Sequence, residues 1–387
     1  MEKEIHFTSS IKFFFVLAVG LYLLPACAKT QERNADSTAL PIEADAFGTD
    51  FEYQFVAESE NGYYIWERLN QDQFYPRLMF IDKVSGRVVP LCNKPDCMHE
   101  GEECNAYFPE KDFGADGVDK QYLQYYEGNL YAVGLSADDY VVLFRIKTDG
   151  SEWEICARLY RTDYISTGHW LQPEILISEG YVYFVDEKQR NQRLERIPIN
   201  GGASEVVFEG NRDASEVRIF RLECRGDNLY FQAHDFWEGT SENALGGLYQ
   251  YNMVTGHCDL IEEGLTSPYS VQGDFVYYGS AEGLCRYSMC NHDVETLVSK
   301  PMDVPNITLT IDYIILCDQM ADHSLTIYDY EGNEIGTVPN NLGLRWYFGG
   351  SSDRLFGEFA DDVGWKRCFL DLTRPLAELG WEELKAE

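Results

Sequence analysis

Basic residues are scarce in this sequence. Its 387 residues include 31 Lys and Arg against 65 Asp and Glu, which gives a formal net charge of −34. A surface of that charge repels the phosphates of nucleic acids, so we exclude nucleic acid as a partner. It also disfavours close adsorption of the folded part to anionic lipid. The simplest interpretation of the charge is solubility at a crowded cell surface.

The sequence also lacks the short motifs that mark catalytic sites. It contains no Gly-x-Ser-x-Gly nucleophile elbow, no His-Glu-x-x-His zinc motif and no phosphate-binding glycine loop. The alternating Asp and Asn ligands of a calcium loop are missing as well. We therefore assign no catalytic residue from the sequence, and the interpretation leans away from an enzyme.

Long hydrophobic runs are missing except near the start of the chain. The run from Phe13 to Leu24 is too short for an ordinary transmembrane helix and is typical of a signal peptide. It ends in Leu24-Pro25-Ala26-Cys27, which resembles the bacterial lipobox. The resemblance implies cleavage after Ala26 and attachment of a lipid to the Cys27 thiol. The alternative is an ordinary secretory signal in which Cys27 has no special role.

These features predict three parts. Residues 1–26 form a lipoprotein signal peptide, and residues 27–48 contain the lipidated Cys27 and a polar, flexible tether. Residues 49–387 form the folded domain. The expected location is the extracytoplasmic face of the cell membrane, with the lipid bilayer as a partner through the N-terminal lipid.

The composition of the domain favours an all-β fold. Aromatic residues reach 14%, and Val, Ile, Tyr and Phe recur in short stretches between Gly, Asp and Asn. One recurring unit joins a turn residue to an apolar and an aromatic residue, as in Tyr63-Tyr64, Leu130-Tyr131, Val182-Tyr183, Leu229-Tyr230 and Val276-Tyr277, with weaker copies at Ile314-Ile315 and Leu355-Phe356. A second unit, a short strand usually followed by a tight turn ending in Gly, follows each copy of the first, with turns such as Ser85-Gly86, Asp149-Gly150, Asn200-Gly201, Thr255-Gly256 and Glu331-Gly332.

The repeat predicts a single β-propeller. About four short strands per period of roughly 40 to 50 residues are typical of propeller blades. Seven paired copies predict about seven blades, with six or eight as the alternative count. A β-sandwich with extra strands is the competing fold, but it does not explain the ordered repeats. If blade 7 lacks its outer strand, residues 40–50 can supply it; the tail from Leu376 to Glu387 forms a last strand or a short helix.

The repeat is similar to that of the TolB-type propellers. The resemblance implies that the strand before the aspartate–glycine turn is innermost and that the aromatic strand is second. The implied inner strands are Phe51–Ser59, Gln121–Tyr126, Glu174–Ser178, Arg221–Arg225, Tyr269–Gln272, Ile307–Ile311 and Trp346–Gly349. A shared fold of this kind carries no function with it.

A cysteine-rich insertion at 91–107 lengthens the first repeat. It contains Cys92, Cys97, His99 and Cys104 with the spacing Cys-x4-Cys-x-His-x4-Cys. Three thiols and an imidazole suit a closed, structural Zn²⁺ site, so the four residues are candidate metal ligands. The alternatives are a disulfide among the three cysteines, which is natural for an exported protein, and a redox or iron–sulfur role. The segment also resembles the LCNKPDCxHxxxxCNA motif of TolB-like propeller lipoproteins from gut-type anaerobic Firmicutes, whose function is not established.

Aromatic residues mark one face of the predicted ring. Loops between second and third strands, and loops between blades, emerge on the same face, where we also place the cysteine insertion. They carry Trp170, the segment from His234 to Gly239 with Trp237, and Trp365, beside several carboxylates. Trp170, His234, Trp237 and Trp365 are therefore candidate ligand-binding residues, because flat rings beside carboxylates suit sugars and peptides. The alternative is that these rings pack loops onto the blade ends.

Two functions are compatible with these features. The first is a membrane-anchored binding or scaffold propeller for a glycan, peptide or protein. The second is a carbohydrate-active enzyme of the glycosidase or lyase type, which would need a carboxylate pair across the central funnel. A sensor or accessory subunit of a membrane partner is a third class.

Overall fold

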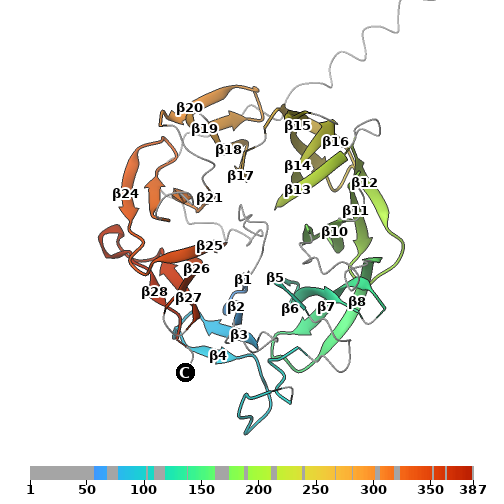
Figure 1. Cartoon of the computed structure of the whole chain (residues 1–387), viewed down its shortest axis with the longest axis vertical. Coiled ribbons are helices and arrows are strands. Elements are labelled where there is room, and N and C mark those ends of the chain that lie inside the picture. The colour runs from blue at the N-terminus through green and yellow to red at the C-terminus, as the bar shows by residue number, and fades with distance from the viewer. Residues whose placement is uncertain are drawn as a thin grey trace, which may run out of the picture. The chain divides into compact units, whose positions relative to one another are not determined.

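The computed structural model describes most of the folded domain. The described residues are 56–67, 77–101, 103–108, 118–136, 138–161, 174–186, 191–210, 216–237, 240–265, 267–280, 282–300, 306–317, 323–350, 353–361 and 364–385. They form seven four-stranded antiparallel sheets, arranged as the blades of a β-propeller (Figure 1). The predicted all-β fold with seven blades is confirmed. No helix in these ranges is long and apolar enough to cross a membrane.

Each blade is built from four consecutive strands. Blades 1 to 4 contain β1 (Val56–Glu58), β2 (Gly62–Glu67), β3 (Arg77–Asp82), β4 (Val88–Pro90); β5 (Val118–Tyr126), β6 (Asn129–Leu135), β7 (Tyr140–Lys147), β8 (Trp153–Arg161); β9 (Ile175–Ser178), β10 (Tyr181–Val185), β11 (Arg193–Pro198), β12 (Glu205–Glu209); β13 (Glu216–Arg225), β14 (Asn228–Trp237), β15 (Thr240–Asn252) and β16 (Cys258–Glu263). Blades 5 to 7 contain β17 (Tyr269–Gln272), β18 (Phe275–Ser280), β19 (Gly283–Ser288), β20 (Val294–Val298); β21 (Asn306–Leu309), β22 (Ile314–Cys317), β23 (Leu325–Tyr328), β24 (Glu334–Val338); β25 (Leu344–Gly350), β26 (Arg354–Ala360), β27 (Trp365–Asp371) and β28 (Glu382–Glu383).

The first strand of each blade faces the centre of the ring (Figure 1). The seven inner strands overlap the seven segments expected from the repeat. The turns between first and second strands contain glycines with positive φ, such as Gly128 at 78° and Gly180 at 73°. Glycine adopts this backbone conformation without steric cost, which explains the turn residue at the head of each repeat. The aromatic residues of the repeat lie in second strands, and Tyr131, Tyr183 and Tyr230 are all buried between blades.

Blade 7 completes its own sheet. The chain after β27 forms a 3₁₀ helix, η1 (Leu376–Glu378), and then β28, which pairs with β27 through Cys368 and Glu383. Because the C-terminal tail supplies the outer strand of blade 7, the condition under which residues 40–50 were expected to supply it is not met. The tail contains both the strand and the short helix that the sequence left as alternatives.

Turn glycines let neighbouring blades approach closely. A Cβ atom on Gly150, in the turn between β7 and β8, would lie 2.2 Å from the carbonyl oxygen of Leu91 in blade 1. A Cβ atom on Gly332, in the equivalent turn of blade 6, would lie 2.5 Å from the carbonyl oxygen of Leu297 in blade 5. Real Cβ contacts are not this short, so only glycine fits where these turns meet the outer edge of the preceding blade.

Side chains also bond the inner strands of neighbouring blades. The buried amide of Gln124 in blade 2 accepts a hydrogen bond from Ile177 N in blade 3 (2.9 Å) and donates one to Ile177 O (2.8 Å). In blade 4, the buried carboxylate of Glu223 accepts a hydrogen bond from Val271 N in blade 5 (3.0 Å). Arg225 donates to Val271 O (2.7 Å) and pairs with Glu223 at 2.8 Å. Backbone groups at the edges of β9 and β17 thus find side-chain partners in the preceding blade.

Candidate metal centre

The cysteine-rich insertion interrupts the outer strand of blade 1. Leu91 N donates to Leu78 O at 2.8 Å, and Leu78 N donates to Ala106 O at 2.7 Å, so chain on both sides of residues 92–105 pairs with β3. Tyr107 then forms a bridge with Arg77. The insertion leaves the rim of the ring beside β4 (Figure 1). The insertion follows β4 and precedes β5, so it lies between blades 1 and 2, and it returns to the start of β3 at Ala106 and Tyr107.

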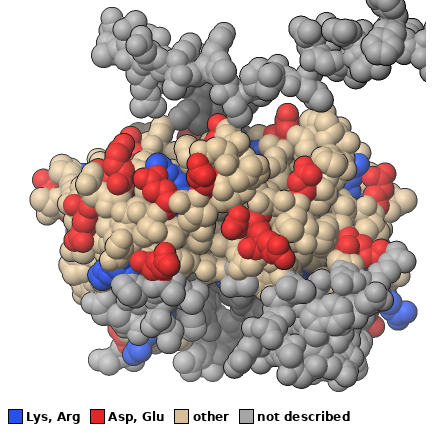
Figure 2. Space-filling model, turned by 90° about the horizontal axis from the view of Figure 1, so that it is seen from above, with Lys and Arg blue, Asp and Glu red and all other residues tan. Residues whose placement is uncertain are grey.

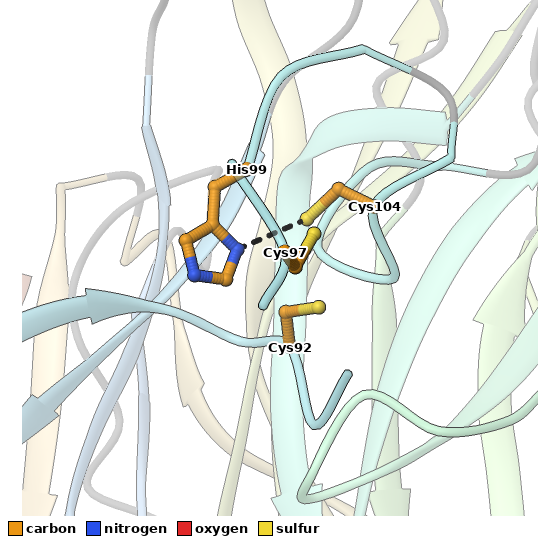
Figure 3. A group of neighbouring side chains, drawn as sticks. All are labelled: Cys92, Cys97, His99 and Cys104. Atoms are coloured by element: carbon orange, nitrogen blue, oxygen red, sulfur yellow. Dashed lines mark hydrogen bonds between the residues drawn. The ribbon is translucent and has the colours of Figure 1, made fainter. Parts of the chain in front are cut away.

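The four candidate ligands lie together in this insertion. The thiols of Cys92, Cys97 and Cys104 and a ring nitrogen of His99 all lie within 4.8 Å of one another, so the cluster could hold a metal ion. Figure 3 shows the four side chains grouped, with the His99 Nδ1 atom facing Cys104 Sγ at 3.5 Å. None of the three cysteines forms a disulfide in the structure. Cys104 is buried, whereas Cys92, Cys97 and His99 are half-buried.

Unusual backbone geometry places these side chains. Asp96 and His99 have positive φ angles of 60° and 56°, and Gly101 has a φ of 70°. Positive φ is uncommon for residues other than glycine, and such residues cluster where surrounding interactions fix the chain. The carbonyl of His99 accepts hydrogen bonds from Arg77 Nη1 and from the Tyr107 hydroxyl, both at 3.4 Å. These bonds hold the turn that directs the imidazole at the thiols.

The environments of the thiols differ. Burial raises the pKa of Cys104 to about 12, so this thiol stays protonated unless a cation compensates for the loss of its proton. Burial alone would raise the pKa of Cys92. Hydrogen bonds from the backbone of Lys94 and Asn105 outweigh this effect, so the net pKa of Cys92 is lowered. Ala106 N donates to Cys104 Sγ at 3.4 Å. Backbone N–H groups directed at sulfur favour thiolates, the form in which cysteine binds metals.

The insertion also contacts blade 2 directly. Asn93 Nδ2 donates to Asp149 Oδ2 at 3.2 Å, and Trp153 Nε1 donates to Asn105 O at 3.4 Å. Asn105 Nδ2 in turn donates to Asn93 Oδ1 at 2.9 Å, which joins the two ends of the insertion. The sequence signalled Asp149 only as part of a turn, and it gave no signal for the roles of Asn93, Asn105 and Trp153.

Of the other candidate residues, the structure describes the side chains of His234 and Trp365 alone. Cys27 and Trp170 lie outside the described residues, and the backbone of Trp237 lies in β14 while its side chain is not described. His234 lies in strand β14, not in a solvated loop, and it is buried with its ring 4.7 Å from that of Phe220. Burial lowers its pKa, so the imidazole is held neutral. A Cβ atom on Gly246 would lie 2.4 Å from its ring, which shows how closely β15 packs against it.

Trp365 lines a small cavity between blades 7 and 1. The cavity has a volume of about 110 Å³ and lies where β27 begins and β2 ends, on the side of the loops between second and third strands. Its lining combines apolar and charged side chains: Ile65, Met79, Val88, Leu384, Trp365, Glu67, Lys366 and Arg367. The charged groups pair with neighbours, since Glu67 contacts Arg77 at 2.5 Å and Lys366 contacts Asp361 at 2.7 Å.

Comparison with known proteins identifies the fold but no family. No family model and no curated protein matches the sequence. A puromycin-hydrolysing peptidase of Mycobacterium tuberculosis is similar in structure, with a TM-score of 0.56 and 12% identity over 89% of this chain and 55% of that one. A structure from a study of two prolyl endopeptidases has a TM-score of 0.54 and 12% identity over 87% of this chain and 50% of that one. BamB from Moraxella catarrhalis covers 81% of this chain and 83% of its own, at 15% identity and a TM-score of 0.44. The chain spans about half of the two peptidases, and likeness at this identity shows the propeller fold alone.

Proposed function

We propose that this protein is a membrane-anchored, extracytoplasmic propeller that acts as a binding or scaffold module, with a structural Zn²⁺ ion in its first blade. Cys27 carries the lipid anchor, as the lipobox resemblance implies. The bound partner is a glycan, a peptide or a protein. The acidic side chains spread over the face seen in Figure 2 fit a protein that stays soluble while tethered near a membrane.

The ligand cluster at the rim carries this proposal. Three thiols and one imidazole within 4.8 Å of one another complete the tetrahedral shell of Zn²⁺ and leave no open position for a substrate. A zinc ion bound there would hold the interrupted outer strand together and would not perform chemistry. A disulfide would use two of the thiols and leave the third thiol and the oriented His99 without a role.

The pairing of two buried carboxylates, Glu223 of the inner strand β13 and Glu358 of the second strand β26, favours a structural role for these groups. Glu223 pairs with Arg225, and Glu358 pairs with Arg367 at 2.9 Å, with both partners less than a tenth exposed. Each carboxylate is thus engaged within its own blade. The cavity beside Trp365 is the described feature that best fits the expected ligand face, because an aromatic ring there lies beside charged groups.

Metal analysis of the purified full chain, combined with thiol titration, tests the zinc site. We expect one Zn²⁺ per chain and its loss in Cys104→Ser, whereas Cys285→Ser, which changes a buried thiol of blade 5, keeps the metal. Chain without stoichiometric metal and with two of the three insertion thiols oxidised would show that the disulfide alternative is right.

A glycan array and a peptide array test the binding function. We expect a selective ligand whose binding weakens in Trp365→Ala but not in Tyr313→Ala, a partly exposed aromatic residue of blade 6. Hydrolysis or elimination of an arrayed sugar would support the enzyme alternative instead. For the anchor, Cys27→Ser should release the chain from the membrane fraction; an unchanged distribution would contradict the lipid attachment.

A further inference from the structure

The contacts between blades 1 and 2 start beside the metal ligands. Leu91 and Asn93 flank Cys92, and Asn105 follows Cys104. Leu91 O is the carbonyl against which the Gly150 turn of blade 2 packs, and Asn93 bonds to Asp149 in that same turn. The position of the ligand residues therefore also determines the position of the groups that contact blade 2.

The equivalent contact between blades 5 and 6 has a different support. There, Gly332 packs against the carbonyl of Leu297, which lies inside the continuous outer strand β20. In blade 1 the outer strand β4 ends at Pro90, before Leu91, and the insertion begins at once. In blade 5 the strand continues through a β-bulge at Leu297 and pairs again at Val298, whereas in blade 1 the chain leaves the sheet beyond Leu91.

The cluster connects the two ends of the insertion, at the place where the outer strand β4 has already ended. The bond from Asn105 to Asn93 joins the two ends of the insertion, and a metal ion on Cys92 and Cys104 would join the same two ends. Trp153 of blade 2 packs on Phe108 with ring centroids 5.7 Å apart and bonds to Asn105 O, so blade 2 contacts the returning end as well.

We propose that the metal acts as a clamp between blades 1 and 2: the ion on Cys92, Cys97, His99 and Cys104 fixes both ends of the insertion, and these ends hold the β7–β8 turn of blade 2. This clamp rests on the zinc site of the proposed function. If the metal strengthens the contact with blade 2 by some free energy, then by linkage the contact strengthens metal binding by the same free energy. A substitution that weakens the contact must therefore also weaken metal binding. A site that serves blade 1 alone would show no such coupling.

The test compares two matched glycines. Gly150→Ala and Gly332→Ala each place a methyl group against a carbonyl of the preceding blade, at φ angles of 73° and 85°. Affinity for Zn²⁺ is measured by chelator competition on the full chain, and the coordination shell is followed by Co²⁺ absorption. We expect Gly150→Ala to lose about tenfold or more in affinity, as is typical when a residue supporting a metal site is changed. Gly332→Ala should lose stability but keep the wild-type affinity.

A milder pair covers the case in which Gly150→Ala fails to fold. Asp149→Ala removes the bond from Asn93, and Glu331→Ala changes the residue before Gly332 in the equivalent turn of blade 6. We expect a several-fold loss of affinity in the first and none in the second. In the wild type, metal removal should speed hydrogen exchange in the β7–β8 turn but not in the β23–β24 turn.

The outcomes separate the two proposals. Zinc that binds the wild type with affinity unchanged in Gly150→Ala and Asp149→Ala, or reduced equally in the blade 6 controls, overturns the clamp and leaves the zinc site standing. A wild-type chain that binds no metal overturns the zinc site and the clamp together.

Discussion

The contact between blades 2 and 3 and the contact between blades 4 and 5 satisfy the same backbone groups with different chemistry. Gln124 and Glu223 occupy equivalent positions, since they pair with Tyr131 and Tyr230 in their second strands. Gln124 both donates and accepts, so one neutral side chain serves the N–H and the carbonyl of Ile177. A carboxylate can only accept, so blade 4 needs Arg225 as donor to the Val271 carbonyl. In blade 4, the Glu223–Arg225 pair thus serves the two backbone groups that the single amide of Gln124 serves in blade 2.

The largest expected effect comes from removing one member of the charged pair. Glu223→Ala leaves Arg225 largely buried without this carboxylate and Val271 N without its acceptor, so the free energy of unfolding should fall by about 3 kcal/mol or more. Chemical denaturation measures the change. A loss below about 1 kcal/mol, the scale of an exposed pair, would contradict this assignment of the pair.

A smaller loss is expected at the neutral contact. Gln124→Ala removes two hydrogen bonds to Ile177 without leaving a buried charge, and it should cost roughly 1–3 kcal/mol. Measured beside Glu223→Ala under the same conditions, it shows how much of the larger loss is due to charge. Equal losses at the two positions would mean that the charge of blade 4 adds nothing to the cost.

A double substitution replaces the charged pair of blade 4 with the two residues that occupy the equivalent positions in blade 2. Tyr126 occupies the position equivalent to Arg225, as their pairing with Asn129 and Asn228 shows, and its hydroxyl accepts a hydrogen bond from Gly180 N at 2.8 Å. The variant Glu223→Gln with Arg225→Tyr should therefore stay within about 1.5 kcal/mol of the wild type, because replacing both members of a buried pair is often tolerated. Glu223→Gln alone should be less stable than the double variant. The reverse order would break the equivalence of the two contacts.

The smallest expected effect is a pH dependence confined to one contact. Burial raises the pKa of Glu223 above its ordinary value of 4.5, opposed by the charge of Arg225. The folded chain then retains this proton at pH values where the unfolded chain has lost it, so this contribution to stability falls as the pH rises from 4.5 through the folded-state pKa. The double variant lacks this component, and Gln124→Ala retains it. Chemical denaturation of the wild type, the double variant and Gln124→Ala at pH values from 4.5 upwards measures the difference. If stability changes with pH in the same way in all three proteins, the prediction is contradicted.

The features that could be predicted from the sequence are those whose determining residues lie close together in the chain. Seven blades and their inner strands follow from a short unit such as Gly180-Tyr181-Val182-Tyr183, in which the turn and the buried aromatic residue are close together. The four ligands of the cluster were recognisable because they lie within one short segment. The bonds of Gln124 and Glu223 were not predicted, because their partners lie 53 and 48 residues further along the chain.

The failures have equally local causes. β28 consists of Glu382 and Glu383, whose charges give no strand pattern, so its place in blade 7 follows only from the sheet it completes. His234 was assigned to a loop because the length of the β14–β15 hairpin is not encoded in the repeat. The return of the insertion to β3 was not predicted, because nothing in its sequence shows that Ala106 pairs with Leu78.

Because every blade consists of four consecutive strands, each blade is encoded by one uninterrupted segment of the sequence. Among the residues that the structure describes, no strand is shared between the ends of the ring, so the junction of blades 7 and 1 has the same topology as the other junctions. A circular permutant with new termini in the connection between β16 and β17 should therefore retain every sheet intact, and duplication of a blade would insert a complete unit. The junction of blades 1 and 2 is the exception, because a permutant opened there would place its new ends beside the four candidate metal ligands.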